Sequence, residues 1–263
     1  MQGLDPLSGY ATSTARGVSG DGTLIVGSSS DASGPFGALR ATMWSPDGTA
    51  TDLGSLLPND GDGEATSASS DGSVVVGYLA SSTAFRWTSA TGAMPLDVPM
   101  GLLYCRANRV SSDGQVVVGS CGGAPITETA VRWAADGLPE KLGVLPGSIA
   151  SEAHSVSGDG SLVVGASYSP TVAFVWDRVH GIRALGDVLT NDFGIDLTGW
   201  TLADATGISA DGRVLVGYGV DPDGHDEGWR VDLAAPVPEP SPGSASIVCF
   251  VFMMAFRTCR RSR

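Results

Sequence analysis

Five residues at equivalent positions of the chain are the first candidates for chemistry. Each directly precedes an alanine that opens a repeated sequence, and together they are Thr14, Glu64, Arg106, Glu152 and Asp204. A ring of three carboxylates and one guanidinium could bind a cation or a sugar. The ends of solvated loops also favour polar residues without any ligand, and we favour this simpler interpretation.

Two further acidic clusters could bind calcium. One contains Asp60 and Asp62, and the other contains Asp221 and Asp223. Carboxylates that alternate around glycine suit an ion that takes roughly six to eight oxygen ligands. Neither cluster follows the full calcium-loop pattern, and Asp-Gly is also an ordinary turn sequence. We therefore expect no cofactor, with calcium as the alternative at these two clusters.

The sequence contains no motif that identifies an enzyme. It has no Gly-x-Ser-x-Gly elbow, phosphate-binding loop or Cys-x-x-Cys pair, and its three histidines are widely separated. We therefore expect a protein without catalytic activity. The alternative is a glycan-active enzyme, a glycosidase or a lyase, that uses Glu64 and Glu152. Paired glycosidase carboxylates lie about 5 to 10 Å apart, so the separation of these two groups distinguishes the hypotheses.

A sequence unit that occurs five times must position the candidate ring. Each copy contains an alanine, a serine, an Asp-Gly turn and an aliphatic run that ends in glycine, and a tryptophan follows. The copies are Ala15 to Gly27, Ala65 to Gly77, Ala107 to Gly119, Ala153 to Gly165 and Ala205 to Gly217. Units of this length predict the blades of a β-propeller, so we expect an all-β domain of five blades over residues 1–234. The ring residues then lie on the innermost strands.

The ends of the repeated region predict how the propeller closes. The last copy has no fourth strand, whereas Gly3–Leu7 resembles the fourth strand of the first copy at Asp52–Leu56. We therefore predict that Gly3–Leu7 pairs in the blade of Trp229 and closes a five-bladed ring, which removes an exposed sheet edge. The loops that vary in length lie on the face opposite to the Asp-Gly hairpins, and we expect binding on that face.

Cross-strand pairing predicts a disulfide between Cys105 and Cys121. A three-residue hairpin loop pairs Ser111 with Gln115, and the same register without a bulge brings the two cysteines together. Such a disulfide implies an oxidising compartment, and the alternative is two buried thiols.

The repeated region is strongly acidic. The chain of 263 residues has a formal net charge of −13, and residues 237–263 hold four of its 15 basic groups but one of its 28 acidic groups, which leaves −16 for the rest. A surface of this charge excludes nucleic acid as an expected partner. Cations, neutral glycans and basic proteins remain as expected ligand classes.

The C-terminal segment has three parts. Residues 235–246 are rich in proline and serine, and residues 247–263 combine an apolar run, expected to be a short helix, with an arginine-rich end. This order resembles the PEP-CTERM sorting signal of Gram-negative envelope proteins, which an exosortase processes. The resemblance implies sorting residues Pro238, Glu239, Pro240, Arg257, Arg260 and Arg261. A plain membrane anchor at the C-terminus is the alternative.

The repeats also resemble a known family. The pattern Ala-x-x-Val-Ser-x-Asp-Gly-x-x-x-Val-Gly followed by Ala-Phe-x-Trp, as at Ala84–Trp87 and Ala173–Trp176, is similar to the HAF family of extracellular repeats. The family has no defined biochemical activity, so the resemblance implies a fold and a location. We expect no signal peptide within this sequence, so the true start lies upstream or the sequence is the mature form.

Together, the two resemblances imply an exported protein of the cell envelope or extracellular matrix. The implied partners are an exosortase-type enzyme, a membrane contacted through the C-terminal segment before processing, and an exopolysaccharide or surface protein. A purely structural envelope component is a further alternative.

Overall fold

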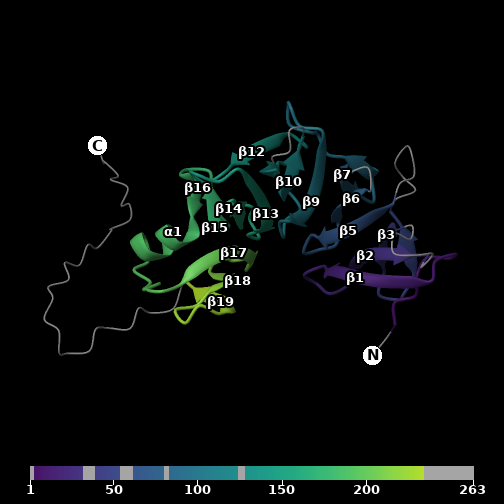
Figure 1. The fold of residues 1–263 in the computed structure, drawn as a ribbon. Coiled ribbons are helices and arrows are strands. Elements are labelled where there is room, and N and C mark those ends of the chain that lie inside the picture. The colour runs from purple at the N-terminus through teal and green to yellow at the C-terminus, as the bar shows by residue number, and fades with distance from the viewer. Residues whose placement is uncertain (1–2, 32–38, 54–61, 80–82, 124–127, 234–263) are drawn as a thin grey trace, which may run out of the picture.

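The structure is a computed structural model that describes residues 3–31, 39–53, 62–79, 83–123 and 128–233 (Figure 1). The linker, the apolar run expected to be a helix, the proposed sorting residues and Asp60 lie outside these ranges. No helix within the described ranges is both long enough and apolar enough to span a membrane.

The described residues form five separate antiparallel sheets, here called blades 1 to 5, that follow one another along an arc (Figure 1). Blade 1 contains β1 (Thr12–Val18), β2 (Ile25–Ser30), β3 (Leu39–Trp44) and β4 (Ala50–Asp52). Blade 2 contains β5 (Gly63–Ala68), β6 (Val74–Leu79), β7 (Ala84–Thr88) and β8 (Gly92–Pro95). Blade 3 contains β9 (Tyr104–Val110), β10 (Val117–Gly122), β11 (Thr129–Trp133) and β12 (Pro139–Gly143).

The last two blades differ in strand number. Blade 4 contains β13 (Ala150–Val156), β14 (Leu162–Tyr168), β15 (Val172–Asp177) and β16 (Gly181–Ala184). The short helix α1 (Leu185–Asn191) follows it, and its buried residues Val188 and Leu189 contribute to the core between blades 4 and 5. Blade 5 has three strands, β17 (Thr201–Ile208), β18 (Val214–Val220) and β19 (Asp226–Asp232).

The Ser-x-Asp-Gly sequence builds the hairpin between the first two strands of each blade. In blade 2, the Asp71 carboxylate accepts hydrogen bonds from the Ser73 amide and from the hydroxyls of Ser69 and Ser73. These bonds lower the pKa of Asp71 to about 2. Gly72 has a φ of +68°, a conformation that side chains with a Cβ rarely adopt. The hairpins also join to one another, because the Ser70 amide donates to the Ser112 carbonyl of the next blade.

Four apolar cores lie between successive blades. In each core, a fully buried valine of the second strand shares the core with a repeat alanine on the first strand of the next blade. The pairs are Val26 with Ala65, Val76 with Ala107, Val118 with Ala153, and Val164 with Ala205. This packing explains why the second strands are aliphatic without alternation, since both of their faces are covered.

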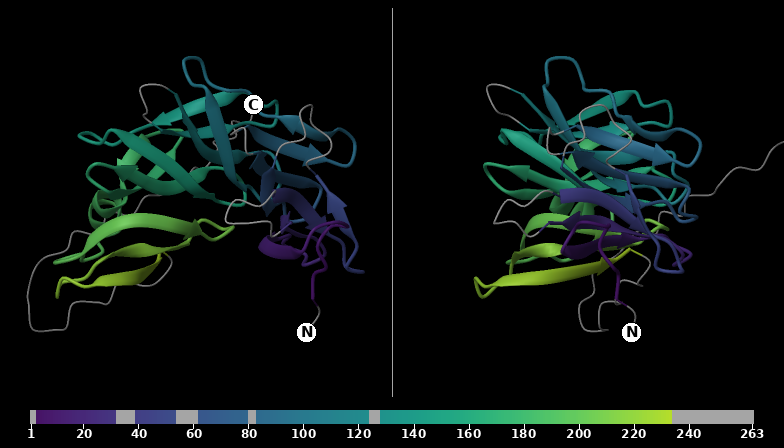
Figure 2. Two further views of the ribbon diagram at one scale, coloured as in Figure 1. Left: turned by 45° about the vertical axis from the view of Figure 1, so that its right-hand side comes forward. Right: turned by 90° about the vertical axis from the view of Figure 1, so that its right-hand side faces the viewer.

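The prediction that Gly3–Leu7 closes the ring was wrong. Among the described residues blade 5 has no fourth strand, and blades 1 and 5 lie at opposite ends of an open arc (Figure 2). Gly3–Leu7 instead runs along blade 1, where the Leu7 amide donates to Ser29 Oγ at 3.0 Å and Trp44 Nε1 donates to the Asp5 carbonyl at 2.7 Å. These bonds to side chains of blade 1 hold the segment on that blade, and it forms no ladder with β19.

Candidate functional site

A β-bulge in the first strand of every blade organises the polar residues near the axis. The register shifts directly after each repeat alanine, which leaves one extra residue in each strand. These bulge residues are Arg16, Thr66, Asn108, His154 and Thr206. The repeat glycine on the second strand permits the bulge, because a Cβ on Gly165 would collide with the Glu152 backbone carbonyl.

Four bulge residues form polar contacts with the following blade. Three of these contacts reach the candidate ring residue of that blade. Arg16 Nε donates to Glu64 Oε1 at 2.6 Å, Asn108 Nδ2 donates to Glu152 Oε1 at 3.0 Å, and His154 Nε2 lies 3.3 Å from Asp204 Oδ2. The fourth, Thr66, donates its hydroxyl to the Ala107 carbonyl at 2.9 Å, next to Arg106. These partners were not predicted, although a polar residue stands two positions after the ring residue in all five copies.

The first cluster of polar side chains, the Glu64 cluster, spans blades 1 to 3. The Glu64 carboxylate accepts hydrogen bonds from Arg16, from the Ser28 hydroxyl and from the Tyr78 hydroxyl. The guanidinium of Arg106 stacks 5.0 Å from the centre of the Tyr78 ring. Burial and the charge of Glu64 raise the pKa of Tyr78. Every charged group of this cluster therefore has a partner within it.

The second cluster, the Asp204 cluster, lies on blades 4 and 5 and contains Glu152, His154, Tyr168 and Asp204. Burial raises the pKa of the Tyr168 hydroxyl, and the charges of Glu152 and Asp204 raise it further. Burial alone would lower the pKa of His154, but Asp204 and Glu152 outweigh it and the net shift is upward. Three ionisable groups and a phenol thus influence one another in one half-buried region.

Asp204 has an acceptor that the rest of the cluster does not use. Its side chain is 8% exposed, and His154 approaches its Oδ2 atom. The Oδ1 atom is buried and has no hydrogen-bond partner among the described residues. Since a buried acceptor without a partner costs about 1 to 3 kcal/mol, this oxygen is suited to a hydrogen-bond donor or cation from a ligand.

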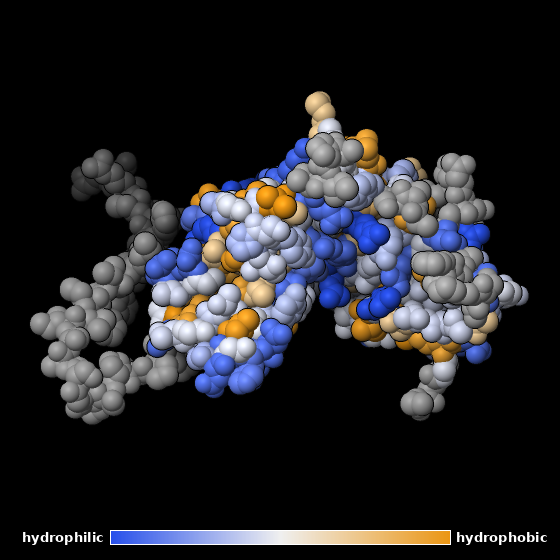
Figure 3. Space-filling model, in the orientation of Figure 1, coloured by the Kyte–Doolittle hydropathy of each residue, from blue (hydrophilic) through white to orange (hydrophobic). Residues whose placement is uncertain are grey.

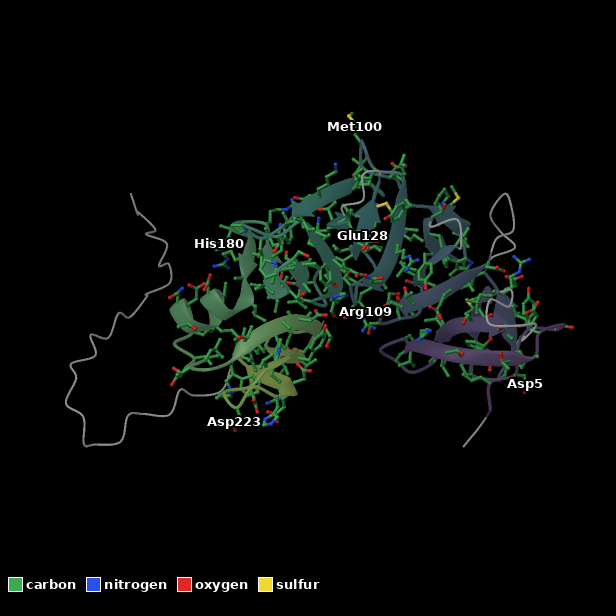
Figure 4. The ribbon with its side chains drawn as sticks, viewed as in Figure 1. Asp5, Met100, Arg109, Glu128, His180 and Asp223 are labelled. Carbon is green, nitrogen blue, oxygen red and sulfur yellow. A yellow bond between two sulfur atoms is a disulfide. The ribbon has the colours of Figure 1, made fainter. Side chains whose placement is uncertain are left out.

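Hydrophilic side chains line the hollow between the two arms of the arc (Figure 3). Within it, a cavity of about 280 Å³ lies among the first strands of all five blades, and Arg109 from β9 borders it. Figure 4 shows Arg109 on the inner side of the arc. The first strands therefore surround a common axis even though the sheets form an open arc.

The remaining sequence candidates lie elsewhere. Thr14 is exposed on β1, where it pairs with Ser28 of the Glu64 cluster but makes no hydrogen bond to Glu64 that the described residues show. Asp62 accepts the amide of Leu39, the first residue of β3, at 3.1 Å. Asp221 accepts the amides of Asp223 and His225, so it closes a turn. Although ligand atoms of these last three residues lie within 4.8 Å of one another, the turn accounts for the arrangement.

A disulfide joins Cys105 on β9 to Cys121 on β10, directly beside Arg106. The register that pairs them differs from the expected one in two ways. The Ser111 amide bonds to the Val116 carbonyl, so the hairpin is one residue longer than expected. The bulge at Asn108 then shifts the register back by one residue, so the two errors cancel at the cysteines.

No family model matches this sequence, and no curated protein matches it. Among solved structures, it is similar to the putative TolB of Agrobacterium tumefaciens, with a TM-score of 0.51 and 17% identity over 89% of this chain and 78% of that chain. It also matches TolB of Acinetobacter baumannii, with a TM-score of 0.45 and 15% identity over 64% of this chain. That match spans 41% of the Acinetobacter chain. The likeness to the Agrobacterium structure shows the fold alone, an all-β array similar to TolB-like β-propellers.

Proposed function

We infer that this protein is an exported binding protein of the cell envelope, which holds a glycan at the Asp204 cluster and does not transform it. The observation that carries this proposal is the buried Asp204 Oδ1 atom, which has no hydrogen-bond partner in the described part of the chain. A sugar hydroxyl or an amino group of a sugar is a hydrogen-bond donor of the kind this oxygen requires.

The surroundings of Asp204 fit a sugar better than a bare cation. Tyr168 and Tyr218 stand near the carboxylates, and the Tyr218 side chain is exposed enough to offer its ring to a ligand. Sugar rings present apolar C–H faces together with hydroxyls, so a site that recognises them combines aromatic rings with a few polar groups. The cluster contains both kinds of group.

The bonding of the two proposed catalytic carboxylates favours binding over hydrolysis. Glu64 already accepts three hydrogen bonds, and Glu152 accepts one from Asn108. A general acid must carry a proton to the leaving group, and a nucleophile must be free to reach the sugar. The three hydrogen bonds to Glu64 stabilise its charged form and fix its orientation, which opposes a role as general acid. Glu64 on β5 and Glu152 on β13 also lie in separate clusters two blades apart.

Export is supported by two independent features. The Cys105–Cys121 disulfide is of a kind that persists in oxidising compartments. The C-terminal segment resembles a PEP-CTERM sorting signal, which implies delivery to the envelope and processing by an exosortase-type enzyme. The test of delivery is the mass of the protein recovered from envelope fractions, before and after substitution of Glu239 by alanine.

The binding proposal is tested with the full chain and defined oligosaccharides. Titration calorimetry with gluco- and chito-oligosaccharides should detect binding, and Asp204→Asn should weaken it at least tenfold because an amide nitrogen can replace the required acceptor. The matched control is Asp187→Asn, which changes the same side chain in the first turn of α1. If no oligosaccharide binds, or if both variants bind equally, the proposal is wrong. Release of shorter sugars during the titration would favour the enzyme instead.

A further inference from the structure

The two ends of the arc carry surfaces that match those buried between the blades. Val216 stands on β18 where the other blades carry Val26, Val76, Val118 and Val164. Those four valines are fully buried, whereas Val216 is 41% exposed. We call the exposed side of β17–β19 around this residue the Val216 face.

The complementary surface lies at the other end. Ala15 is exposed on β1, whereas the four equivalent alanines are fully buried in the cores between blades. Val18 is 59% exposed, but its equivalents Val110 and Val156 are 6% exposed. We call the exposed side of β1 the Ala15 face. In each of the four internal cores, the equivalents of Val216 and Ala15 pack together.

The N-terminal segment contacts blade 1 in the same way that the chain leaving one blade contacts the next blade. The Leu7 amide donates a hydrogen bond to Ser29 Oγ of blade 1. The equivalent bond joins the amide of Leu145, which follows blade 3, to Ser167 Oγ of blade 4. Trp44 Nε1 also donates to the Asp5 carbonyl. In the same way, Trp133 Nε1 of blade 3 donates to the Asp97 carbonyl, which follows blade 2. Gly3–Leu7 therefore occupies the place of the segment that leads from the fourth strand of one blade to the next blade.

Among the described residues, blade 5 is one strand shorter than the other blades. It has three strands where the other blades have four, and β19 forms its outer edge. The bulge residue Thr206 makes only one of the two hydrogen bonds of its equivalent Thr66. Its hydroxyl donates to the Val216 carbonyl, as the Thr66 hydroxyl donates to the Val76 carbonyl. Thr66 also reaches the Ala107 carbonyl of the next blade, and the equivalent acceptor for Thr206 is the carbonyl of Ala15.

We propose that the Val216 face of one copy of this chain binds the Ala15 face of a second copy, which places the second copy's Gly3–Leu7 next to the outer strands of blade 5. A second copy is the occupant because both faces are exposed in one chain and each reproduces one side of an interface that the chain already forms four times. The contact joins two different faces, so copies add head to tail. This surface is separate from the Asp204 cluster.

The test is the molar mass of the full chain measured by light scattering across a range of concentrations in one mild detergent. Wild-type protein should exceed the monomer mass increasingly with concentration. Ala15→Arg and Val216→Arg should each remain monomeric, because each blocks one face. Val179→Arg is the control, since Val179 is 84% exposed in a turn away from both faces, and it should associate like wild type.

Mixing the two blocked variants distinguishes a head-to-tail contact from other kinds of association. Each variant retains one intact face, so an equimolar mixture should form dimers of one copy of each, with a dissociation constant within about tenfold of wild type. Circular dichroism spectra that match wild type exclude misfolding of the variants. A wild-type monomer at every concentration, which is the result for a chain that closes on itself, overturns the proposal. A mixture that stays monomeric, or loss of association in Val179→Arg, also overturns it.

Discussion

Replacement of Gly165 by alanine should destabilise the protein by about 2 kcal/mol. The added Cβ would collide with the backbone carbonyl of Glu152, and the next atoms it would meet are also backbone atoms. Backbone within a sheet ladder cannot rotate away as a side chain can, so the cost lies near the upper end of the roughly 1 to 3 kcal/mol typical of overpacking. The lower entropy of alanine in the unfolded chain offsets up to about 1 kcal/mol of this.

The assay is thermal unfolding followed by circular dichroism, with Gly228→Ala as the matched control. Gly228 is also a strand glycine, but its added Cβ would come no closer than 3.7 Å to the Gly217 carbonyl, which is an ordinary contact. For a domain of this size, about 2 kcal/mol corresponds to a decrease of roughly 4 to 8 °C in Tm. Gly228→Ala should leave Tm unchanged or raise it slightly. Equal Tm values for the two variants would refute the view that the repeat glycine exists to admit the bulge.

Three further outcomes follow from single contacts. Replacing Cys105 and Cys121 together by alanine should lower the free energy of unfolding by about 3 kcal/mol, measured by urea denaturation, and an unchanged midpoint would contradict a stabilising disulfide. Trp44→Phe should cost about 1 kcal/mol more than Trp229→Phe, because the Nε1 of Trp44 donates to a carbonyl and that of Trp229 has no partner among the described residues; equal costs would disprove this. The pKa of His154 is raised above 6.5 in the folded state, so its contribution to stability is complete below pH 6.5 and is lost as the pH rises through the folded pKa. His154→Asn should remove this part of the pH dependence of the unfolding free energy. The same pH dependence in the variant and the wild type would count against this prediction.

The repeats predicted which residues share a strand, but not how the ends of the array pack. The Ser-x-Asp-Gly turns and the aliphatic runs depend on contacts within a blade, and these are legible from one copy. Closure depends on a choice between two surfaces for Gly3–Leu7. The resemblance predicted a strand at Gly3–Leu7, but this segment forms no strand, and its backbone groups bond to Ser29 and Trp44 on blade 1. Sequence similarity between repeats cannot distinguish these two outcomes, because both place the segment at the same junction.

The β-bulge was not predicted, and it changed the candidate site more than any other feature. Alternation of side chains along a strand suggests one partner per residue, whereas the bulge inserts a residue that the ladder leaves out. Its signal in the sequence was the glycine that recurs on the second strand, where the carbonyl of the ring residue approaches too closely for any Cβ. The expected ring consequently divides, with Glu64 in one cluster and Asp204 in the other.

The bulge also explains how five similar blades can hold different chemistry. Each ring residue is set by its own blade, but the group that contacts or neighbours it comes from the bulge of the blade before. Arg16 pairs fully with Glu64, whereas His154 approaches one oxygen of Asp204 and leaves the other without a partner among the described residues. The proposed glycan site therefore lies at the junction where the pairing is incomplete. At the last junction no described blade follows Thr206, and this is the place where we propose contact with a second copy.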